Sequence, residues 1–372
     1  MVLARFSPFR QSLGGVIRYL LRDDFLTDNP GPLDGLTIPS EPGPGNTTYV
    51  DTENMITLLS GRAIFSGGKA SPEMTDPSLY LEEIYARVIG RTAVFKINRG
   101  ASGTGELGFN PSTSQRVHIG AYLQSTQLRA WAGEGFTVVT VGDIQADTEY
   151  HIAVVLRSFG SFVFIRGGLF AEWTLIWVDP EGGTTDLRIR VNSHHFVGLG
   201  VDMLGLIDLA RYDPRFATDD GLATSVLVNP VTNATAQHEA DCLIEWNLIF
   251  DGTLAQMAFR RLDASNGWYV SIHVDGSLNL YELVGGVSAW RAFGGVGAVT
   301  AGARRIVIVA VGNVYRVYLD RALSFTYTDP NSYHINNTGL RLISNGTDNA
   351  RTSRIAAFPR RIYSSALDRA VR

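Results

Sequence analysis

The sequence predicts an all-β protein, with two tandem β-sandwich domains preceded by a short N-terminal arm. Short apolar runs recur with turn residues between them, a helical period is almost absent, and one β-rich pattern runs through the chain twice. The 372 residues suffice for two domains of ordinary size. Hydrophobic residues make up 45% of the chain and charged residues 18%, which is typical of a folded globular protein.

The duplication is visible in two matched strand pairs that are offset by about 154 residues, each followed by a similar closing segment. A repeat of this length indicates a duplicated domain, because solenoid units span about 20–50 residues. An interruption of the strand pattern at 218–222 places the boundary, so we expect domains at 23–220 and 221–372. In order, the repeated segments are 152–156, 162–165 and 206–213, and then 306–309, 315–319 and 354–363.

Residues 1–22 form the predicted arm, which carries four arginines and no acid. Its apolar side chains need a surface to cover, so we expect the arm to anchor the protein on a neighbouring protein. A mobile tail is the alternative. Ser12 could cap a short helix that continues to Leu21, although Gly14-Gly15 weakens it. The proposed anchoring residues are Phe6, Phe9, Arg10, Arg18 and Leu20.

Strands are predicted wherever a short apolar or alternating run lies between turn signals. Asp275-Gly276 is the strongest hairpin signal, since this dipeptide suits a tight turn. Helices are expected only in the arm, near 213–220 and at 364–371. The predicted strands are 55–59, 62–65, 84–89, 93–97, 116–123, 127–131, 136–141, 150–156, 162–166, 174–178, 186–191, 203–212, 225–228, 241–250, 255–261, 268–274, 278–283, 289–293, 303–311, 314–319, 339–343 and 354–363.

Charge and cysteine content argue against several classes of protein. The net charge of −4 argues against a nucleic-acid partner, which needs a basic surface. No apolar stretch reaches the ~18 residues that cross a bilayer, so no membrane partner is expected. Cys242 is the single cysteine, so no intrachain disulfide can form, and its apolar surroundings predict a buried small hydrophobe.

The order of strands and the closing segments resemble the concanavalin A-like lectin/glucanase superfamily, which includes laminin-G-like modules. The resemblance covers about 23–215 and 223–365, and it implies two jelly-roll sandwiches. The segments 22–28, 41–45 and 60–65 are similar to the start of sandwich domains in structural proteins of tailed phages. Because this superfamily includes enzymes, lectins and structural modules, the fold alone does not give the function.

A run of acidic residues is the strongest candidate for catalysis. Glu239, Asp241 and Glu245 would share one face of a strand, and retaining glycosidases need two carboxylates about 5–5.5 Å apart. The spacing here, Glu-x-Asp-x-x-x-Glu, departs from that of the family-16-like glucanases that the run resembles. We therefore expect no catalytic residues and no enzyme activity, with a family-16-like glycanase as an alternative.

No metal-ligand spacing is present, so neither a cofactor nor a metal site is predicted. His194 and His195 are adjacent and would point to opposite faces of a strand. The resemblance to laminin-G-like modules leaves a structural Ca²⁺ open.

Aromatic side chains could form a platform for a sugar, because sugars stack on flat aromatic faces. For most of the candidates we favour packing in the core. Trp131 and Trp290 lie next to loops and are the predicted carbohydrate-binding residues. The candidates are Trp131, Trp173, Trp177, Trp246, Trp268, Trp290, Tyr269 and Tyr281.

The duplicated sandwich, the arm and the lack of a catalytic motif lead to one interpretation and two alternatives. We expect a non-enzymatic structural component of a virion, from a probable tailed phage, anchored by its arm to other virion proteins. Symmetric display makes a homo-oligomer the expected state. The alternatives are a carbohydrate-binding module that recognises host-surface glycan and the glycanase.

Overall fold

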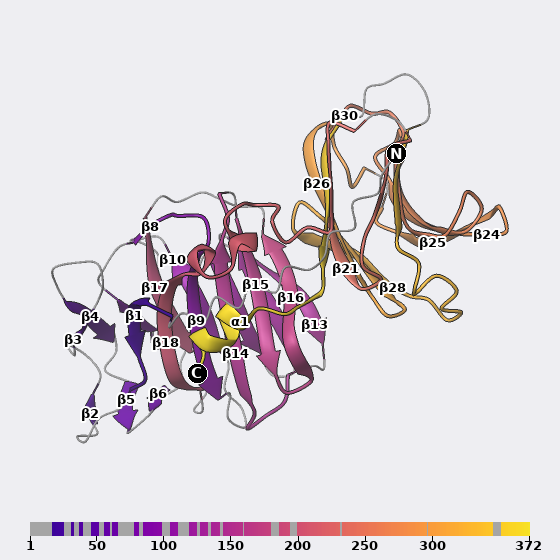
Figure 1. Ribbon diagram of the computed structural model, residues 1–372. Coiled ribbons are helices and arrows are strands. Elements are labelled where there is room, and N and C mark those ends of the chain that lie inside the picture. The colour runs from indigo at the N-terminus through magenta and orange to yellow at the C-terminus, as the bar shows by residue number, and fades with distance from the viewer. Residues whose placement is uncertain are drawn as a thin grey trace.

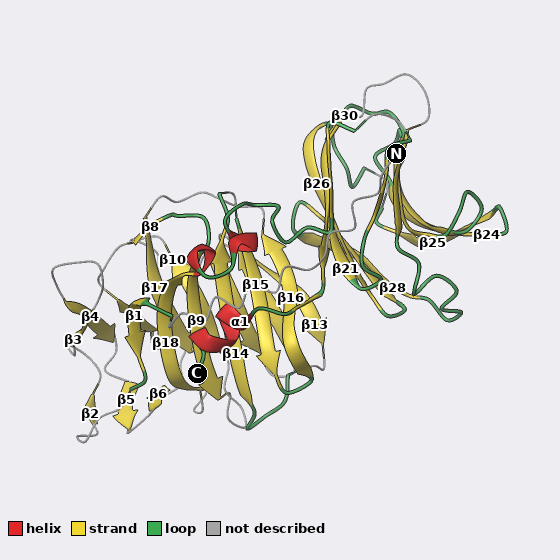
Figure 2. Cartoon of the chain, in the orientation of Figure 1, coloured by secondary structure: helices red, strands yellow, loops and turns green. Residues whose placement is uncertain are grey.

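The computed structural model shows two β-sandwiches joined in one chain (Figure 1). Nearly all regular structure is strand, with one short α-helix and two turns of 3-10 helix in the described residues (Figure 2). The all-β prediction is therefore confirmed. The structure describes residues 17–25, 85–98, 144–158, 160–179, 199–230, 233–295, 297–344 and 351–372, together with 186–193 and the short strands between residues 31 and 141 that are named below.

The first sandwich consists of two antiparallel sheets. Sheet I has the order β2-β5-β6-β18-β9-β14-β15-β16-β31, with β1 also beside β18. Its strands are β1 (Tyr19–Asp23), β2 (Gly31–Pro32), β5 (Ile56–Leu59), β6 (Arg62–Phe65), β9 (Arg91–Asn98), β14 (Glu149–Leu156), β15 (Ser161–Gly167), β16 (Phe170–Asp179), β18 (Leu199–Asp208) and β31 (Arg361–Ile362).

Sheet II has the order β13-β12-β11-β10-β17-β7-β4-β3, with β8 also beside β17. Its strands are β3 (Thr37–Pro39), β4 (Asn46–Asp51), β7 (Ser78–Leu81), β8 (Tyr85–Ala86), β10 (Gly105–Asn110), β11 (Ile119–Gln124), β12 (Gln127–Ala132), β13 (Gly135–Val141) and β17 (Asp186–Ser193). Buried side chains of both sheets, such as Phe95 and Leu107, belong to one apolar core.

The second sandwich repeats this plan with sheets III and IV. Sheet III has the order β19-β30-β21-β26-β27-β28, and sheet IV has the order β20-β29-β22-β23-β24-β25. The strands are β19 (Ser225–Val228), β20 (Thr235–Gln237), β21 (Cys242–Phe250), β22 (Ala255–Arg261), β23 (Gly267–Ile272), β24 (Leu278–Val284), β25 (Val287–Phe293), β26 (Gly302–Val311), β27 (Val314–Leu319), β28 (Ala322–Thr328), β29 (Gly339–Ser344) and β30 (Arg351–Pro359).

The predicted repeat is visible in the strand orders. The series β18-β9-β14-β15-β16 in sheet I corresponds to β30-β21-β26-β27-β28 in sheet III. The series β7-β17-β10-β11-β12-β13 in sheet II likewise corresponds to β20-β29-β22-β23-β24-β25 in sheet IV. The strand pairs from which the repeat was inferred, β14 with β15 and β26 with β27, occupy equivalent places.

The predicted helix in the arm is wrong where the structure describes it. Tyr19–Asp23 forms strand β1, which pairs with β18 from Ile207 to Leu204. This pairing satisfies backbone groups of β18 beyond its contact with β6, and it buries Leu21. Tertiary pairing thus outweighs the weak local signal for a helix.

The two other predicted helical segments are correct in place, although one differs in type. The segment near 213–220 holds a 3-10 helix at Pro214–Phe216. A second 3-10 helix, at Leu209–Arg211, replaces the end of the predicted strand 203–212, because β18 stops at Asp208. Helix α1 spans Ser365–Ala370, and Ser364 caps it by accepting a hydrogen bond from the Leu367 backbone N–H. None of the helices in the described residues is long and apolar enough to cross a membrane.

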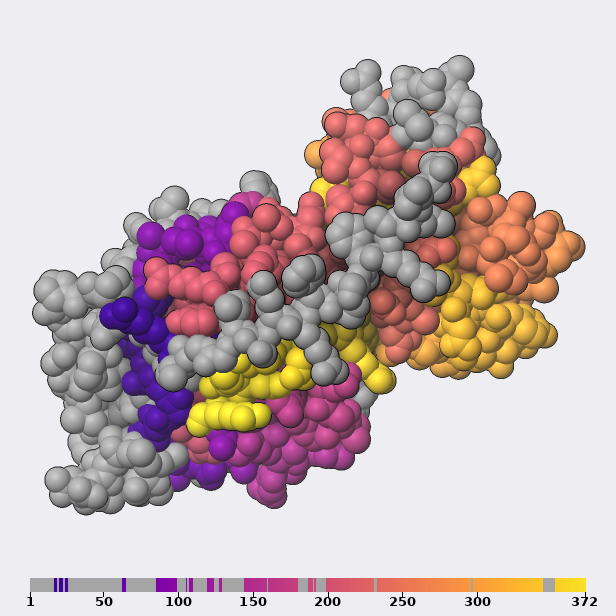
Figure 3. All heavy atoms as spheres, in the orientation of Figure 1, coloured from indigo at the N-terminus to yellow at the C-terminus, as the bar shows by residue number. Residues whose placement is uncertain are grey.

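The C-terminal segment returns to the first sandwich after the last strand of sheet III. Ile362 in β31 pairs with Trp173 in β16, and the carbonyl of Arg360 accepts a hydrogen bond from the Leu175 N–H at 2.7 Å. Leu367 and Ala370 are fully buried in the core cluster of the first sandwich. Figure 3 shows the C-terminal segment in yellow against the magenta surface of that sandwich.

Sheet III packs its outward face against the first sandwich. Trp177 and Tyr318 make an edge contact with ring centroids 4.9 Å apart, and Phe162 and Phe358 make another at 5.3 Å. Leu243 of β21 belongs to the core cluster of the first sandwich. Its neighbours on the other face of β21, such as Ile244, lie in the core of the second sandwich. Successive side chains of β21 therefore pack into the cores of different sandwiches.

Candidate functional site

A straight row of side-chain positions crosses the outer face of sheet IV. Cross-strand pairing links each position to the next, because residues paired across antiparallel strands point to the same face. In order across β20, β29, β22, β23, β24 and β25, the row is Thr235, Arg341, Ala258, Tyr269, Tyr281 and Trp290. We call its last three members, Tyr269, Tyr281 and Trp290, the aromatic row.

Strand alternation places the aromatic row on the outer face. Trp268 and Val270, which flank Tyr269, are fully buried in the core of the second sandwich, and so is Leu280 beside Tyr281. Since successive side chains of a strand point to opposite faces, both tyrosines face outward. In Figure 1, β24 and β25 lie at the end of the second sandwich far from the first.

A β-bulge sets the direction of Trp290. Leu280 pairs with Ala292 and Tyr281 pairs with Trp290, so Arg291 is an extra residue in β25. The Arg291 guanidinium reaches the fully buried carboxylate of Glu282, with Nη2 at 2.7 Å from Oε2. Trp290 is left on the outer face with 60% of its surface exposed.

The aromatic side chains hold one another in place. The Tyr269 and Tyr281 rings stack with centroids 4.8 Å apart and planes 7° apart. Tyr281 also stacks on His273, and its hydroxyl lies 3.1 Å from His273 Nε2. The Trp290 indole N–H donates to the Ala292 carbonyl at 3.0 Å, and its ring makes an edge contact with Phe293. Fixed rings lose little conformational entropy when a ligand binds.

Polar groups surround the aromatic row. The hydroxyls of Tyr269 and Ser288 are hydrogen-bonded at 2.5 Å, and Gln256 Nε2 donates to Ser271 Oγ at 3.3 Å. Partial burial, the neighbouring Tyr269 and Asp275 raise the pKa of Tyr281, so its hydroxyl stays protonated at neutral pH. It can therefore donate as well as accept a hydrogen bond.

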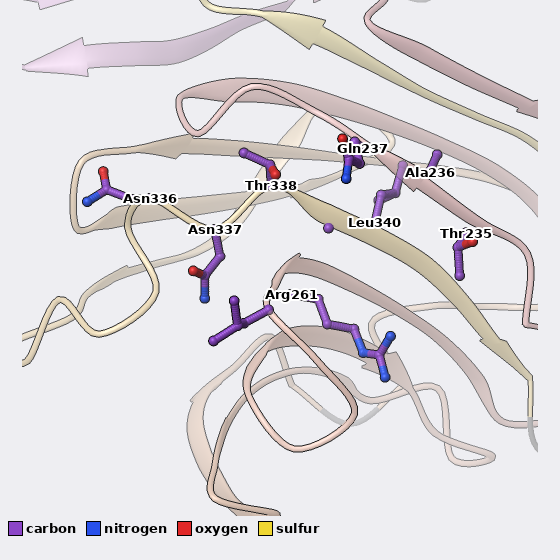
Figure 4. Close-up of a pocket in the computed structure, with 10 residues that line it drawn as sticks. Thr235, Ala236, Gln237, Arg261, Asn336, Asn337, Thr338 and Leu340 are labelled. Atoms are coloured by element: carbon purple, nitrogen blue, oxygen red, sulfur yellow. The ribbon is translucent and has the colours of Figure 1, made fainter. Parts of the chain in front are cut away.

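A polar pocket of about 570 Å³ lies at the other end of the same sheet. Three segments line it: β20, residues 336–340 and the end of β22, as Figure 4 shows. Gly339 is required where these segments meet, because a Cβ there would lie 2.3 Å from the Arg261 carbonyl oxygen. The lining residues are Thr235, Ala236, Gln237, Arg261, Leu262, Asn336, Asn337, Thr338, Gly339 and Leu340.

The structure locates the predicted carbohydrate-binding residues in different sandwiches. Trp290 is exposed on sheet IV, whereas Trp131 lies in β12 of sheet II, with a side chain outside the described residues. For Tyr269 and Tyr281 the sequence pattern favours packing in the core, whereas both side chains face outward on sheet IV. Their one-residue alternation with Trp268 and Leu280 was the signal that could have found them. Trp173, Trp177, Trp246 and Trp268 are buried, as expected for core residues.

The acidic run does not form an open carboxylate pair. β21 begins at Cys242, so the exposed Glu239 precedes the strand. Asp241 accepts hydrogen bonds from Arg260 Nη2 at 3.1 Å and from the Gly312 N–H at 2.8 Å. Glu245 is only 4% exposed. Cys242 is buried as predicted, and burial raises the pKa of its thiol to about 12.

Glu245 joins the two sandwiches electrostatically. Its carboxylate accepts from Arg305 Nε at 2.8 Å, from Arg354 Nη1 at 2.7 Å and from Arg157 Nη2 at 3.3 Å. Arg157 follows β14 of the first sandwich, and the other two arginines lie on sheet III. Arg305 Nη2 also donates to the Val178 carbonyl in β16 at 2.9 Å. We call Glu245 with Arg157, Arg305 and Arg354 the interface cluster.

Asp179, at the end of β16, should make stability depend on pH. Burial raises its pKa to about 7 against the opposing effect of Arg321, Arg305, Arg87 and Arg157. Between the ordinary value of 3.8 and about 7, the native chain keeps a proton that the unfolded chain has released. Stability therefore falls as pH rises through this window.

Asp179→Asn removes this titration. The free energy of unfolding of the variant should therefore exceed that of the wild type by an amount that increases as pH rises. The comparison is urea unfolding of both proteins at about pH 4.5 and about pH 8. A variant less stable than the wild type at the higher pH would contradict the assignment.

The other sequence candidates that the structure describes lie on the first sandwich. Phe6, Phe9 and Arg10 are outside the described residues, as are His194 and His195. Leu20 packs against the core of the first sandwich. Arg18 is exposed, and its backbone N–H donates to the Tyr212 hydroxyl at 2.8 Å. Across the described ranges, no three His, Cys, Asp or Glu side chains come together as metal ligands would.

Comparisons with known proteins returned structures but no sequence relatives. No family model and no curated protein matches the chain. Among solved structures, it is similar to the carbohydrate-binding module CBM66 from Bacillus subtilis, with 15% identity over 37% of this chain and 94% of that one, at a TM-score of 0.26. The chain is also similar to galectin LEC-6 of Caenorhabditis elegans, with 9% identity over 36% of this chain and 94% of that one, at a TM-score of 0.29.

A third similar structure, domains LG4-5 of the mouse laminin alpha1 chain, spans more of the sequence. It has 12% identity over 74% of this chain and 84% of that chain, at a TM-score of 0.25. The three structures are thus a carbohydrate-binding module, a galectin and a pair of laminin domains. At such low scores, they carry no argument about ligand or activity, and the β-sandwich description rests on the sheets themselves.

Proposed function

We propose that this protein is a non-enzymatic glycan-binding protein that holds its ligand on the outer face of sheet IV. The observation that carries the proposal is the aromatic row, in which three aligned strands each present one aromatic side chain to the same face. Packing in a core would bury Trp290, but its ring is exposed beside two stacked tyrosines. Such an exposed aromatic patch indicates a surface for a ligand.

The chemistry of the row suits a carbohydrate. The apolar face of a sugar ring stacks on an aromatic ring, while hydroxyl groups at its edge need hydrogen-bond partners. The tyrosine hydroxyls, Ser288 and His273 supply such partners beside the rings. Strands about 4.8 Å apart give the six-position row a length of about 24 Å. This length suits an extended oligosaccharide rather than a single sugar.

Trp290→Ala is expected to weaken glycan binding at least about tenfold, or roughly 1.4 kcal/mol, because it removes the most exposed ring of the row. The measurement is binding of the wild-type protein to a glycan array, followed by titration calorimetry of the best ligand against both proteins.

Tyr363→Ala is the matched control for this experiment. Tyr363 is 78% exposed but lies beside α1 on the first sandwich, so its loss should leave affinity unchanged. An array without any bound glycan would refute the proposal. Equal affinities of the wild type and Trp290→Ala would refute the site.

The non-enzymatic part of the proposal is supported by the interface cluster. Three arginines engage the Glu245 carboxylate, and the side chain is buried between the sandwiches. A retaining glycosidase needs a carboxylate that reaches the substrate. Release of reducing sugar from β-glucans by the wild type would favour the glycanase instead.

A role in a virus particle is the second candidate. The contacts between sheet III and the first sandwich, together with the returning C-terminal segment, make the two sandwiches a single unit, as a displayed module requires. The attachment itself is proposed through the N-terminal arm, with a homo-oligomer as the expected state. Mass spectrometry of gradient-purified particles from the source culture tests this role. Peptides found only in the soluble fraction would rule it out.

A further inference from the structure

Two arginines lie on sheet IV beyond the aromatic row. Arg341 belongs to the cross-strand row and pairs with Ala258, which in turn pairs with Tyr269. Arg261 lines the polar pocket, and the pocket residue Thr235 pairs with Arg341. The guanidinium groups thus lie at the end of the sheet face opposite to Trp290.

No carboxylate in the described part of the chain forms an ion pair with either guanidinium. Arg341 Nη2 donates to the side-chain oxygen of Asn233, which is neutral. The charge of Asp263 acts on Arg261, but the Asp263 carboxylate accepts hydrogen bonds from the Ser265 N–H at 2.7 Å and from the Asn266 side chain at 3.0 Å. The three arginines of the interface cluster, in contrast, share the Glu245 carboxylate.

The two guanidinium groups repel each other. Burial, followed by the charge of Arg341, lowers the pKa of Arg261, whereas Asp263 opposes the shift. A bound anion would reverse this repulsion, because each guanidinium would then face a negative charge. The pocket beside Arg261 holds neutral donors such as Asn337, Gln237 and Thr338.

We propose that Arg261 and Arg341 bind an anionic substituent, a carboxylate or a sulfate, of a glycan that lies along the aromatic row. This inference rests on the proposed function and specifies its ligand class. Stacking on Tyr269, Tyr281 and Trp290 accepts many sugars, whereas the two arginines select acidic ones. Guanidinium groups suit this task because their planar donors match the oxygens of a carboxylate or sulfate.

The test compares matched acidic and neutral ligands. A short oligogalacturonate is titrated beside the same oligomer with its carboxyl groups methyl-esterified, and a sulfated galactan oligomer beside its desulfated form. The wild type should bind the acidic member of at least one pair about tenfold more tightly at low salt. The pair that shows the preference identifies carboxylate or sulfate as the group recognised.

Substitutions test whether the two arginines cause the preference for the acidic ligand. The double variant Arg261→Gln/Arg341→Gln should bind the acidic and neutral members of a pair with equal affinity. Arg341→Lys keeps the positive charge and should retain part of the preference that the double variant loses. Arg361→Gln, an exposed arginine outside sheet IV, is the control and should behave as the wild type. Thermal unfolding of each variant verifies that it is folded.

The outcomes separate this inference from the proposed function. If the wild type binds both members of each pair with equal affinity, the selection of acidic glycans is wrong and glycan binding stands. If the preference survives in the folded double variant, other groups bind the anion and the assignment is wrong. If no glycan binds at all, the proposed function and this inference fail together.

Discussion

Glu245→Ala is expected to lower the free energy of unfolding by about 3–5 kcal/mol, because removal of one partner of a buried ion pair leaves uncompensated charge. Arg157, Arg305 and Arg354 would lose their shared carboxylate in a site where Glu245 is 4% exposed. Burial already lowers the pKa of Arg305, and it lowers that of Arg354 to about 10. Keeping these guanidinium groups charged in the buried site therefore costs free energy.

Chemical denaturation at neutral pH, with tryptophan fluorescence as the signal, measures this effect. Glu239→Ala is the matched control, because Glu239 is an exposed acid six positions earlier and its loss should change stability by no more than about 0.5 kcal/mol. A loss below about 1 kcal/mol for Glu245→Ala would show that the interface cluster does not hold the sandwiches together.

Deletion of residues 361–372 is expected to destabilise the first sandwich by on the order of 5 kcal/mol, since Ile362, Leu367 and Val371 would lose their burial. The deletion also removes the β31–β16 pairing and the hydrogen bond of 2.9 Å from the Trp173 indole N–H to Asp368. The second sandwich retains its own strands and should be affected less.

Hydrogen exchange resolves this effect by sheet. Faster exchange is expected in β14, β15 and β16 of the deletion variant, with little change in β22, β23 and β24. The matched variant Asp368→Asn keeps the tail and removes only the charge that Arg166 and Trp173 contact, so a smaller loss is expected. Equal exchange in the wild type and the deletion variant would show that the tail contributes nothing to the first sandwich.

Much of the fold could be predicted from local signals. Alternation and turn residues located most strands, and the helix predicted at 364–371 is present as α1. The repeat could be found because two hairpins, β14–β15 and β26–β27, kept similar lengths and apolar patterns. Such features depend on residues close together in the sequence.

The parts that were missed depend on residues far apart in the sequence. Tyr19–Asp23 became a strand because β18, nearly two hundred residues later, offers it a pairing edge. Glu245 resembled a catalytic carboxylate in sequence, but Arg157, Arg305 and Arg354 surround it only after folding. No sequence pattern gives such partners.

The candidate site was found only in part, for a related reason. Trp290 was chosen because a glycine-rich loop precedes it, and the structure exposes it. The sequence does not show that Tyr269 and Tyr281 line up with Trp290, because this alignment depends on the register of β23, β24 and β25. The bulge at Arg291, which sets this register, has no local signature.

Hydrogen exchange with and without the best glycan from the array tests the central claim most directly. Bound glycan should slow exchange in β23, β24 and β25, which carry the aromatic row, and at β29, where Arg341 lies. Sheets I and II should show no change. Two results would contradict the claim that the outer face of sheet IV is the binding site. One is slower exchange in the first sandwich when glycan is bound, and the other is unchanged exchange in sheet IV with a glycan that binds.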